Sequence, residues 1–345
     1  MDFQFFQEFL SIDSTSGKER KVAEWLAERL PGMFPVANRP ALRAEEVGDG
    51  TLNLLLTWGT PRIVFCSHLD TVPPYITPTF PGGVFLSEPS LRETVIKGRG
   101  SCDAKGQVFA IVEACKRLAD EGKTDFGMLL LAGEETGSWG AKAFAKTEFR
   151  AEYVVVGEPT DNCMVSASKG TKSFDLKFTG EPFHSGYPEH GVSAVDLFVD
   201  FVNALKAKDF GMDPVLGETT WNIGLLKSDN PQNILSPELT CRIYFRTTFV
   251  SDEAVSKWME EAQSGRLTVT ARGGDTPARY WTVDGLPSKS VAFGSDAPHL
   301  KNFTYKAICG PGSITVAHRD DEHVLVADLA TAVEQYIALY RSVTE

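Results

Sequence analysis

Several ionisable side chains in this sequence could together carry out hydrolysis. Most of them follow short apolar runs, one precedes an expected helix and one comes late in the chain. They belong to an SHLDT segment, a GRGSCDAKG segment, a GEE pair, a GEP turn and a late AHRDDEH segment. The residues concerned are His68, Asp70, Asp103, Glu134, Glu135, Glu158 and His318. Carboxylates that crowd together repel one another, and burial increases the cost. A divalent cation would remove that cost, so the set predicts a metal site.

The mixture of histidines and carboxylates also narrows the choice of ion. Imidazole is a borderline ligand, which favours zinc, cobalt or manganese over calcium or magnesium. Two such ions about 3.5–4 Å apart share a bridging carboxylate and lower the pKa of a water molecule towards ~7. We therefore expect two divalent metal ions, zinc first and cobalt or manganese as alternatives, and a hydrolytic reaction. Each motif alone also fits a solvated surface group, so the ordered set carries the prediction.

The elements that must position these residues alternate along the first half of the chain. Apolar runs at 62–67, 127–132 and 153–156 are typical of strands buried on both faces. Helices are expected at 17–30, 104–119 and 138–146. This alternation predicts an α/β fold, with a mostly parallel mixed sheet and helices on both faces. The carboxyl ends of such strands line one crevice, so the ionisable residues are expected to meet there.

The pattern changes near residue 165, where strands begin to alternate apolar and polar residues as half-buried strands do. Strands and helices are expected at 173–180, 191–206, 240–248, 252–262 and 266–271. Two helices on one antiparallel sheet of about four strands would form an α+β domain. The first pattern resumes after about 280, with a strand at 305–310 and a closing helix at 326–343. We predict a catalytic domain of residues 1–167 and 278–345 and an inserted domain of residues 168–277.

Composition excludes several classes of partner. The 345 residues include 34 Lys and Arg against 46 Asp and Glu, a net charge of −12, and such an acidic surface repels nucleic acid. No apolar run approaches the ~20 residues of a membrane helix, so no membrane partner is expected. The start, MDFQFFQEFL, has acids where a secretory signal carries bases, which predicts a cytoplasmic protein. The six cysteines form no CxxC pair, so no disulfide framework is expected.

Taken in order, SHLDTVP, GRGSCDAKG, GEETGSWGA, VVGEPT and GPGSITVAHRDDEHV resemble the M20 family of di-metal peptidases and deacylases. The resemblance covers nearly the whole chain. It implies a di-zinc exopeptidase-like catalytic domain, with the inserted domain serving as lid and dimerisation domain, and hence a homodimer. It also implies the metal ligands His68, Asp103, Glu135, Glu158 and His318.

Within that set the resemblance implies separate roles. Asp103 would bridge the two ions, His68 and Glu158 would bind one of them, and Glu135 and His318 would bind the other. Asp70 would orient the ring of His68 from its far nitrogen, an arrangement that also raises ligand basicity. Glu134 would be the general base that takes a proton from the attacking water.

Residues of the substrate side are also implied. His184, in EPFHSGYPEHGVSAVD, matches a histidine that reaches an active site, often across a dimer, and would donate to the oxyanion. Asn233 and Arg246 resemble residues that hold the oxyanion or a substrate carboxylate. Ser295 and Asp296 belong to a segment that resembles a substrate-side loop, which implies that they contact substrate. The alternative interpretations are that His184 is a surface histidine in a Gly/Pro loop and that Arg246 lies on the exposed face of an edge strand. Relatives often have an acid before the arginine, which YFRT lacks.

Glutamate at position 158 bears on the substrate. In similar enzymes glutamate here accompanies deacylases and carboxypeptidase-like members, and aspartate accompanies aminopeptidases. We therefore expect an N-acyl amino acid or a short peptide as substrate. The first expectation is an acetylornithine deacetylase-like enzyme of arginine biosynthesis, because of the GPGSITVAH run and the GSDAP loop. The alternatives are a succinyl-diaminopimelate desuccinylase-like or N-acetylcitrulline deacylase, an M20 di- or tripeptidase or carboxypeptidase, and a non-catalytic binding protein on the same scaffold.

Overall fold

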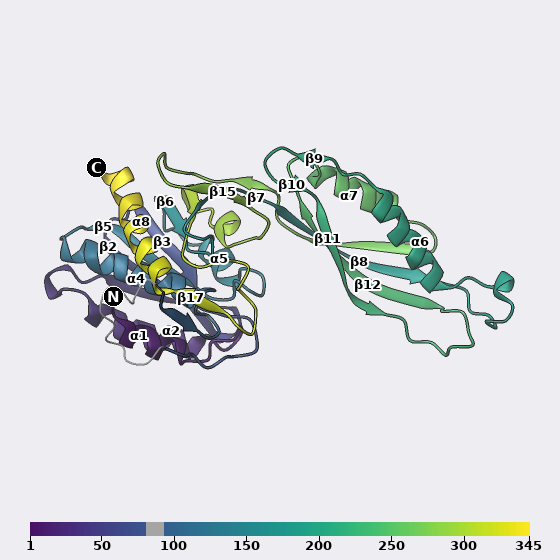
Figure 1. Cartoon of the computed structure of the whole chain (residues 1–345), viewed down its shortest axis with the longest axis horizontal. Coiled ribbons are helices and arrows are strands. Elements are labelled where there is room, and N and C mark those ends of the chain that lie inside the picture. Colours follow the sequence, from purple (N-terminus) through teal and green to yellow (C-terminus); the bar gives the residue numbers. More distant parts are fainter. Residues whose placement is uncertain (81–92) are drawn as a thin grey trace. The chain divides into compact units, whose positions relative to one another are not determined.

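The computed structural model describes residues 1–80 and 93–345, which form two compact units (Figure 1). Unit 1 comprises Met1–Ser166, Tyr280–Lys289 and Ser295–Glu345, and unit 2 comprises Ala167–Arg279 and Ser290–Gly294. The short segment Ser290–Gly294 thus groups with unit 2, although it lies outside the range expected for the inserted domain. Among the described residues, none of the helices has the length and apolar character needed to span a bilayer.

Unit 1 is built on a six-stranded mixed sheet in the order β1-β2-β5-β3-β6-β16. Its strands are β1 (Ala41–Val47), β2 (Thr51–Gly59), β3 (Ile63–His68), β5 (Asp125–Leu131), β6 (Ala151–Val156) and β16 (Phe303–Ile308). The four strands from β5 to β16 are parallel, and β1 and β2 join the sheet antiparallel. Every residue of β3 is buried, as expected for a central strand covered on both faces.

Within the described residues, five helices pack around this sheet: α1 (Phe3–Leu10), α2 (Arg20–Arg29), α4 (Lys105–Asp120), α5 (Trp139–Phe144) and α8 (Val326–Thr344). Helices α4 and α8 pack against each other and against β3, whereas α5 contacts β1, β2 and β5. The core between the helices is rich in aromatic rings, including Phe6 and Phe109 stacked 4.4 Å apart. The α/β fold with a mixed sheet and helices confirms the predicted fold class.

Unit 2 contains an antiparallel sheet in the order β11-β12-β8-β13. Its elements are β8 (Gly170–Thr179), α6 (Ala194–Ala207), β11 (Thr220–Lys227), β12 (Glu238–Thr247), α7 (Asp252–Glu261) and β13 (Leu267–Gly273). Along β12, Cys241, Ile243 and Phe245 are buried while Tyr244 is exposed. This alternation gives the unit a second apolar core, in which both helices cover the sheet.

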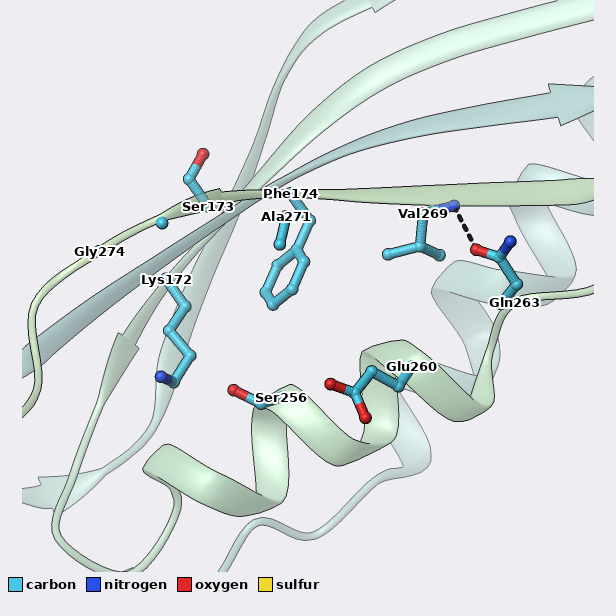
Figure 2. A pocket seen from close by; sticks show the side chains of 10 residues that line it. Lys172, Ser173, Phe174, Ser256, Glu260, Gln263, Val269, Ala271 and Gly274 are labelled. Atoms are coloured by element: carbon cyan, nitrogen blue, oxygen red, sulfur yellow. Dashed lines mark hydrogen bonds between the residues drawn. The ribbon is translucent and has the colours of Figure 1, made fainter.

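A hollow of about 410 Å³ lies in unit 2 between β8, β13 and α7. Figure 2 shows Lys172 and Glu260 at this hollow, with the ring of Phe174 on the sheet side. Its lining contains a single carboxylate and no histidine or cysteine. The hollow is therefore not the predicted metal site.

Short elements complete the described chain. A two-stranded sheet joins β4 (Val95–Lys97) and β17 (His323–Leu325), another joins β9 (Met212–Asp213) and β10 (Gly217–Glu218), and a third sheet has the order β14-β7-β15. Its strands are β7 (Met164–Ser168), β14 (Ala278–Arg279) and β15 (Ser288–Val291). The 3₁₀ turns are η1 (Leu30–Met33), η2 (Val36–Asn38), η3 (Gly48–Gly50), η4 (Pro188–His190) and η5 (Ala297–His299). All six cysteines are free, and only Cys163 among them is not buried.

The hairpin of β1 and β2 was not predicted by the sequence patterns. Strand β1 is mostly exposed and carries the charged residues Arg43, Glu45 and Glu46, as edge strands commonly do. In β2 the polar Asn53 interrupts the apolar run, yet it is buried because its amide donates to the carbonyl of Gly140 and accepts from the N–H of Ala132. Such distant partners leave no local pattern.

Candidate metal centre

The carboxyl ends of three parallel strands carry four of the predicted ionisable residues of unit 1. His68 is the last residue of β3, Glu134 and Glu135 follow β5, and Glu158 follows β6. The strand register aligns these ends, because His68 pairs with Leu131, the last residue of β5, and Cys66 pairs with Val156, the last residue of β6. Parallel pairing therefore places the three loops on one edge of the sheet.

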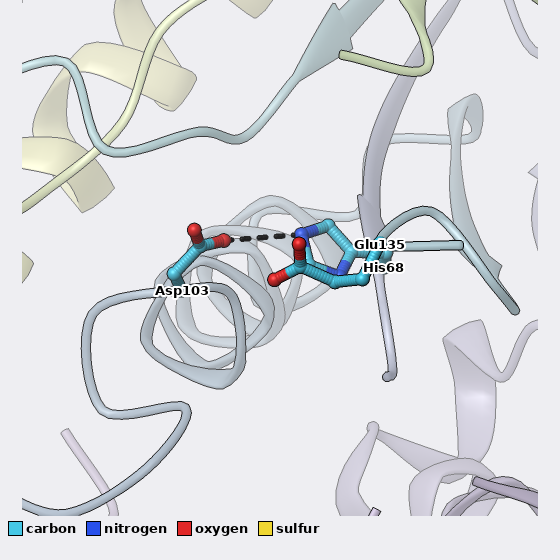
Figure 3. Close-up of side chains that lie close together, drawn as sticks. All are labelled: His68, Asp103 and Glu135. Atoms are coloured by element: carbon cyan, nitrogen blue, oxygen red, sulfur yellow. Dashed lines mark hydrogen bonds and ion pairs between the residues drawn. The ribbon is translucent and has the colours of Figure 1, made fainter. Parts of the chain in front are cut away.

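Three of these side chains form a tight cluster, with one ligand atom from each of His68, Asp103 and Glu135 within 4.8 Å of the others (Figure 3). One carboxylate oxygen of Asp103 lies 3.1 Å from Nε2 of His68, and the other lies 3.2 Å from Nε2 of His318. Nε2 of His318 also lies 3.0 Å from Oε1 of Glu135. The two oxygens of Asp103 thus face different histidines, which is the arrangement a bridging carboxylate needs.

Asp70 contacts both the ring of His68 and the backbone of the two adjacent glutamates. Nδ1 of His68 lies 3.0 Å from the carbonyl oxygen of Asp70 and 3.4 Å from its Oδ1. The same carboxylate accepts hydrogen bonds from the backbone N–H groups of Glu134 (3.0 Å) and Glu135 (3.2 Å) and from the hydroxyl of Ser16 (2.8 Å). One buried acid therefore fixes both the imidazole ring and the turn that carries the two glutamates, leaving Nε2 of His68 free to face Asp103.

The protonation equilibria show how unfavourable this crowding is. Burial raises the pKa of Glu134 and of Glu158 well above the ordinary range for glutamate. Hydrogen bonds to Asp103 and Glu135 raise the pKa of His318 to about 10. Burial opposes protonation of His68, but the neighbouring carboxylates of Asp103 and Asp70 outweigh it and raise its pKa as well. The cluster therefore attracts positive charge.

The donor set fits divalent metal ions. Glu158 is only 4% exposed, and its Oε1 has no hydrogen-bond partner among the described residues, an expensive state for a buried carboxylate oxygen. A metal ion bound by that oxygen would remove the cost. Two imidazoles with three carboxylates suit zinc, cobalt or manganese. The residues present thus agree with the chemistry expected of this site.

One buried acid near the cluster belongs to the predicted substrate-side loop and not to the predicted metal ligands. Asp296 is 1% exposed, its carboxylate accepts a hydrogen bond from the hydroxyl of Ser138, and its Oδ1 has no partner among the described residues. Burial raises its pKa to about 6. Its neighbour Ser295, predicted to contact substrate, is buried and accepts a local hydrogen bond from the N–H of Ala297 (3.3 Å). The resemblance of the GSDAP segment to a substrate-side loop implied both residues as substrate contacts, and Asp296 is the more deeply buried of the two.

The other predicted substrate-side residues belong to unit 2. His184 is exposed, and its Nδ1 accepts a hydrogen bond from the N–H of Gly186 (3.1 Å). The N–H of Ser185 donates to the carbonyl oxygen of Asn233 (2.9 Å), so the segments of His184 and Asn233 are neighbours. Arg246 lies over the ring of Tyr244 at 5.0 Å on β12, which is an interior strand and not an edge. The roles of these three residues stay predictions.

Comparison with known proteins bears on the assignment. The model of the family described as Peptidase family M20/M25/M40 matches residues 64–342. The chain belongs to this M20 peptidase family. A probable carboxypeptidase from Aspergillus terreus is 32% identical over an alignment covering 96% of this chain and 84% of that protein. Membership of the M20 family and these relatives support an enzyme that hydrolyses amide bonds.

Solved structures show the same fold. A tripeptidase from Staphylococcus aureus superposes with a TM-score of 0.78 at 18% identity, covering 97% of this chain and 95% of that one. A dinuclear metal-binding M20 peptidase from Bacillus subtilis gives a TM-score of 0.68 at 8% identity, covering 98% and 96%. These structures agree with the predicted fold, and the family model and the Aspergillus relative confirm the family. The names of these M20 relatives support peptidase chemistry in general and do not single out an acetylornithine deacetylase.

Proposed function

We propose that this M20 protein is a metal-dependent, carboxypeptidase-type amidohydrolase. Its substrate would be an N-acylated amino acid or short peptide that ends in a free carboxylate. The observation that carries the proposal is Asp103, whose two oxygens face His68 and His318 within hydrogen-bond distance. The substrate class is supported by the glutamate at position 158 and by the names of relatives, several of which are probable carboxypeptidases.

The proposed ligands form two sets that share one residue. His68 and Glu158 would hold one ion, Glu135 and His318 the other, and Asp103 both. Zinc, cobalt and manganese all suit this set. Bound ions would supply Lewis acidity that polarises the scissile carbonyl and makes water easier to deprotonate.

Glu134 is the proposed general base. Asp70 fixes its backbone by accepting the N–H of Glu134, and burial raises the pKa of its carboxyl group, which suits a residue that accepts a proton and then returns it. Glu134 takes a proton from water as the water oxygen bonds to the carbonyl carbon. It then delivers that proton to the amide nitrogen as the C–N bond breaks. The products are a carboxylic acid and an amine.

On the substrate side we propose that His184 donates a hydrogen bond to the oxyanion. Pre-organised donors of this kind stabilise the charge that develops in the transition state. Asn233, Arg246 and Ser295 are proposed substrate contacts, with Arg246 apt for a carboxylate because its guanidinium binds in a bidentate way. As the family resemblance implies, we also propose a homodimer through unit 2. Size-exclusion chromatography coupled to light scattering would test this.

A second candidate is an N-acyl amino acid deacylase of the acetylornithine type. The same ligands and base serve both reactions, and the GPGSITVAH run and the GSDAP loop favour it. The two candidates differ in the acyl group, which is a peptide in one case and a short acid such as acetate in the other.

A substrate panel separates these candidates. Purified protein supplied with zinc or cobalt would be assayed on N-blocked dipeptides, on the same dipeptides with an amidated C-terminus, on N-acetylornithine and on unblocked dipeptides. We expect cleavage of the N-blocked dipeptides and loss of that activity on amidation. Cleavage of N-acetylornithine alone would favour the deacylase. Turnover confined to substrates with a free amine would contradict both.

A further inference from the structure

A buried ion pair lies next to the metal centre without belonging to the proposed ligand set. Arg99 and Glu322 are 2% and 1% exposed, and Nη1 of Arg99 donates to Oε2 of Glu322 at 2.6 Å. Oε1 of Glu322 accepts three backbone hydrogen bonds, from the N–H groups of Gly100 (2.9 Å), Cys102 (3.1 Å) and Asp103 (3.0 Å). One carboxylate thus organises the backbone that presents Asp103.

The same pair joins this backbone to the loop that carries His318. Glu322 follows His318 by four residues and directly precedes β17, which pairs with β4. Arg99 also donates from Nη1 to the carbonyl oxygen of Arg319 (3.1 Å). The N–H of Gly98 donates to the backbone carbonyl of Glu322 (3.0 Å). The loops 98–104 and 318–322 are therefore held together by both members of the pair.

The loop that carries His318 is less well fixed by secondary structure than the strand that carries His68. His68 ends a strand that is buried along its whole length, so the sheet fixes it. The side chain of His318 is 48% exposed, and its φ of +64° lies in the left-handed region, which non-glycine residues seldom adopt. A residue in that conformation keeps its place only when its surroundings hold it.

Stability alone gives little reason for a buried pair here. Taking two charges out of water is costly, and apolar side chains of similar volume often serve as well. Burial raises the pKa of Glu322, whereas the backbone N–H donors and Arg99 favour its ionised form. Those N–H groups immediately precede α4, whose N-cap residue Ala104 makes no side-chain capping hydrogen bond within the described structure. Glu322 thus supplies the negative charge that a helix start favours.

We propose that Glu322, with Arg99, is a positioning residue that sets the distance between Asp103 and His318. It thereby maintains the affinity of the metal site to which His318 and Glu135 belong. The inference rests on the proposed function for the identity of the ligands. Glu322 touches neither substrate nor metal in this proposal, and it acts only through the two loops.

The test is cobalt binding to metal-free protein, measured by calorimetry and by the cobalt absorption spectrum. The variant Glu322→Gln keeps the shape of the side chain but turns an amide donor or an uncharged oxygen towards Arg99. We expect the dissociation constant of one ion to rise at least about 10-fold, as loss of a supporting partner typically does, and that of the other by less than about threefold. The weakened site should be the same one that His318→Ala weakens, as the cobalt spectrum reports. The control Glu334→Gln breaks the exposed Arg117–Glu334 pair of the same unit and should change neither constant.

A double-mutant cycle distinguishes positioning from general destabilisation. If Glu322 acts through His318, then Glu322→Gln should add less than about a threefold loss in a His318→Ala background, because residues acting as one unit are not additive. Additive losses, equal weakening of both sites or unchanged constants would each overturn the proposal. Should Glu322→Gln not fold, Arg99→Lys keeps the charge but gives up the forked contacts, and it should show the same pattern.

The outcomes also separate this proposal from the proposed function. Wild-type protein that binds no cobalt would overturn both. Wild-type protein that binds two ions, together with an unaltered Glu322→Gln variant, would overturn the positioning role alone.

Discussion

Two adjacent glutamates illustrate how neighbours in sequence acquire different chemistry. Glu135 contacts His318 at 3.0 Å, whereas the buried carboxyl of Glu134 has its pKa raised mainly by loss of solvent. Both backbone N–H groups donate to Asp70, so one acid sets the directions of both side chains. The proposed metal ligand and the proposed general base can therefore be adjacent in sequence and still have different roles.

This difference predicts separate effects of two isosteric changes. Glu134→Gln should lower kcat by about 10²–10⁴-fold, the usual contribution of a general base, and leave the number of bound cobalt ions unchanged. The matched change Glu135→Gln should weaken metal binding as well as activity. Turnover and metal content, measured on the same preparations, check this; loss of metal from Glu134→Gln would show that its role is misassigned.

At this scale the sequence predicts the residues that follow strands and misses those with distant partners. His68, Glu135 and Glu158 could be found because each closes an apolar run. Glu322 contacts backbone groups about 220 residues earlier in the chain, and Asp296 is held by Ser138. No local pattern encodes contacts of that range. Glu322 therefore looked like an ordinary polar residue, and Asp296 was indicated only by the resemblance of its loop.

Helix α4 begins with a buried lysine, and this burial affects how the stability of the protein depends on pH. Lys105 is almost wholly buried, and its ammonium donates to the carbonyl oxygens of Phe9 (3.1 Å) and Ile12 (2.5 Å). Burial lowers its pKa to about 7 from the ordinary 10.5. The apolar period predicted this helix correctly, but it could not predict that a lysine of its first turn would be buried under α1.

The shifted pKa predicts how stability depends on pH. Between about pH 7 and 10.5 the unfolded chain binds the lysine proton and the folded chain does not, so the free energy of unfolding should rise with pH across this window. Lys105→Met should remove this rise, which amounts to at most ~1.4 kcal/mol per pH unit. Urea unfolding at pH 7 and pH 9 measures it, with Lys21→Met on the exposed face of α2 as control. An unchanged slope in Lys105→Met would contradict the assignment.

At the scale of the whole molecule, the proposed metal ligands lie in unit 1 and the proposed oxyanion donor His184 in unit 2. The alternation of strands and helices was sufficient to predict the α/β class and the change of pattern near residue 165. Loops were harder, because the polar, Gly- and Pro-rich segment around His184 has no periodic signal. Its function could be inferred only by resemblance.

The role of His184 has a test that involves both units. His184→Ala should lower kcat by about 10²–10³-fold, the usual cost of removing one oxyanion donor, with no change in cobalt affinity. His190→Ala, in the same loop region, is the matched control and should have little effect. Equal losses in the two variants would indicate that the loop matters only for folding.

Metal should also stabilise the protein against heat. A ligand that binds only the folded state adds RT ln(1 + [L]/Kd), about 2.7 kcal/mol at 100 times Kd. Added cobalt should therefore raise Tm, and a chelator should reverse the rise. Calorimetry on wild-type protein and on Asp103→Ala checks this, because the variant lacks the residue shared by both proposed ligand sets. A rise of equal size in Asp103→Ala would place the stabilising ion elsewhere.

The six cysteine thiols can report on local unfolding of the protein, because their exposure differs. In the native protein a polar maleimide should modify a single sulfur, that of Cys163, because the other five are shielded. Of the shielded sulfurs, only Cys241 belongs to unit 2, whereas Cys66, Cys102, Cys115 and Cys309 belong to unit 1. Mapping the order in which they react under mild denaturant would reveal which unit opens first, without any engineered probe.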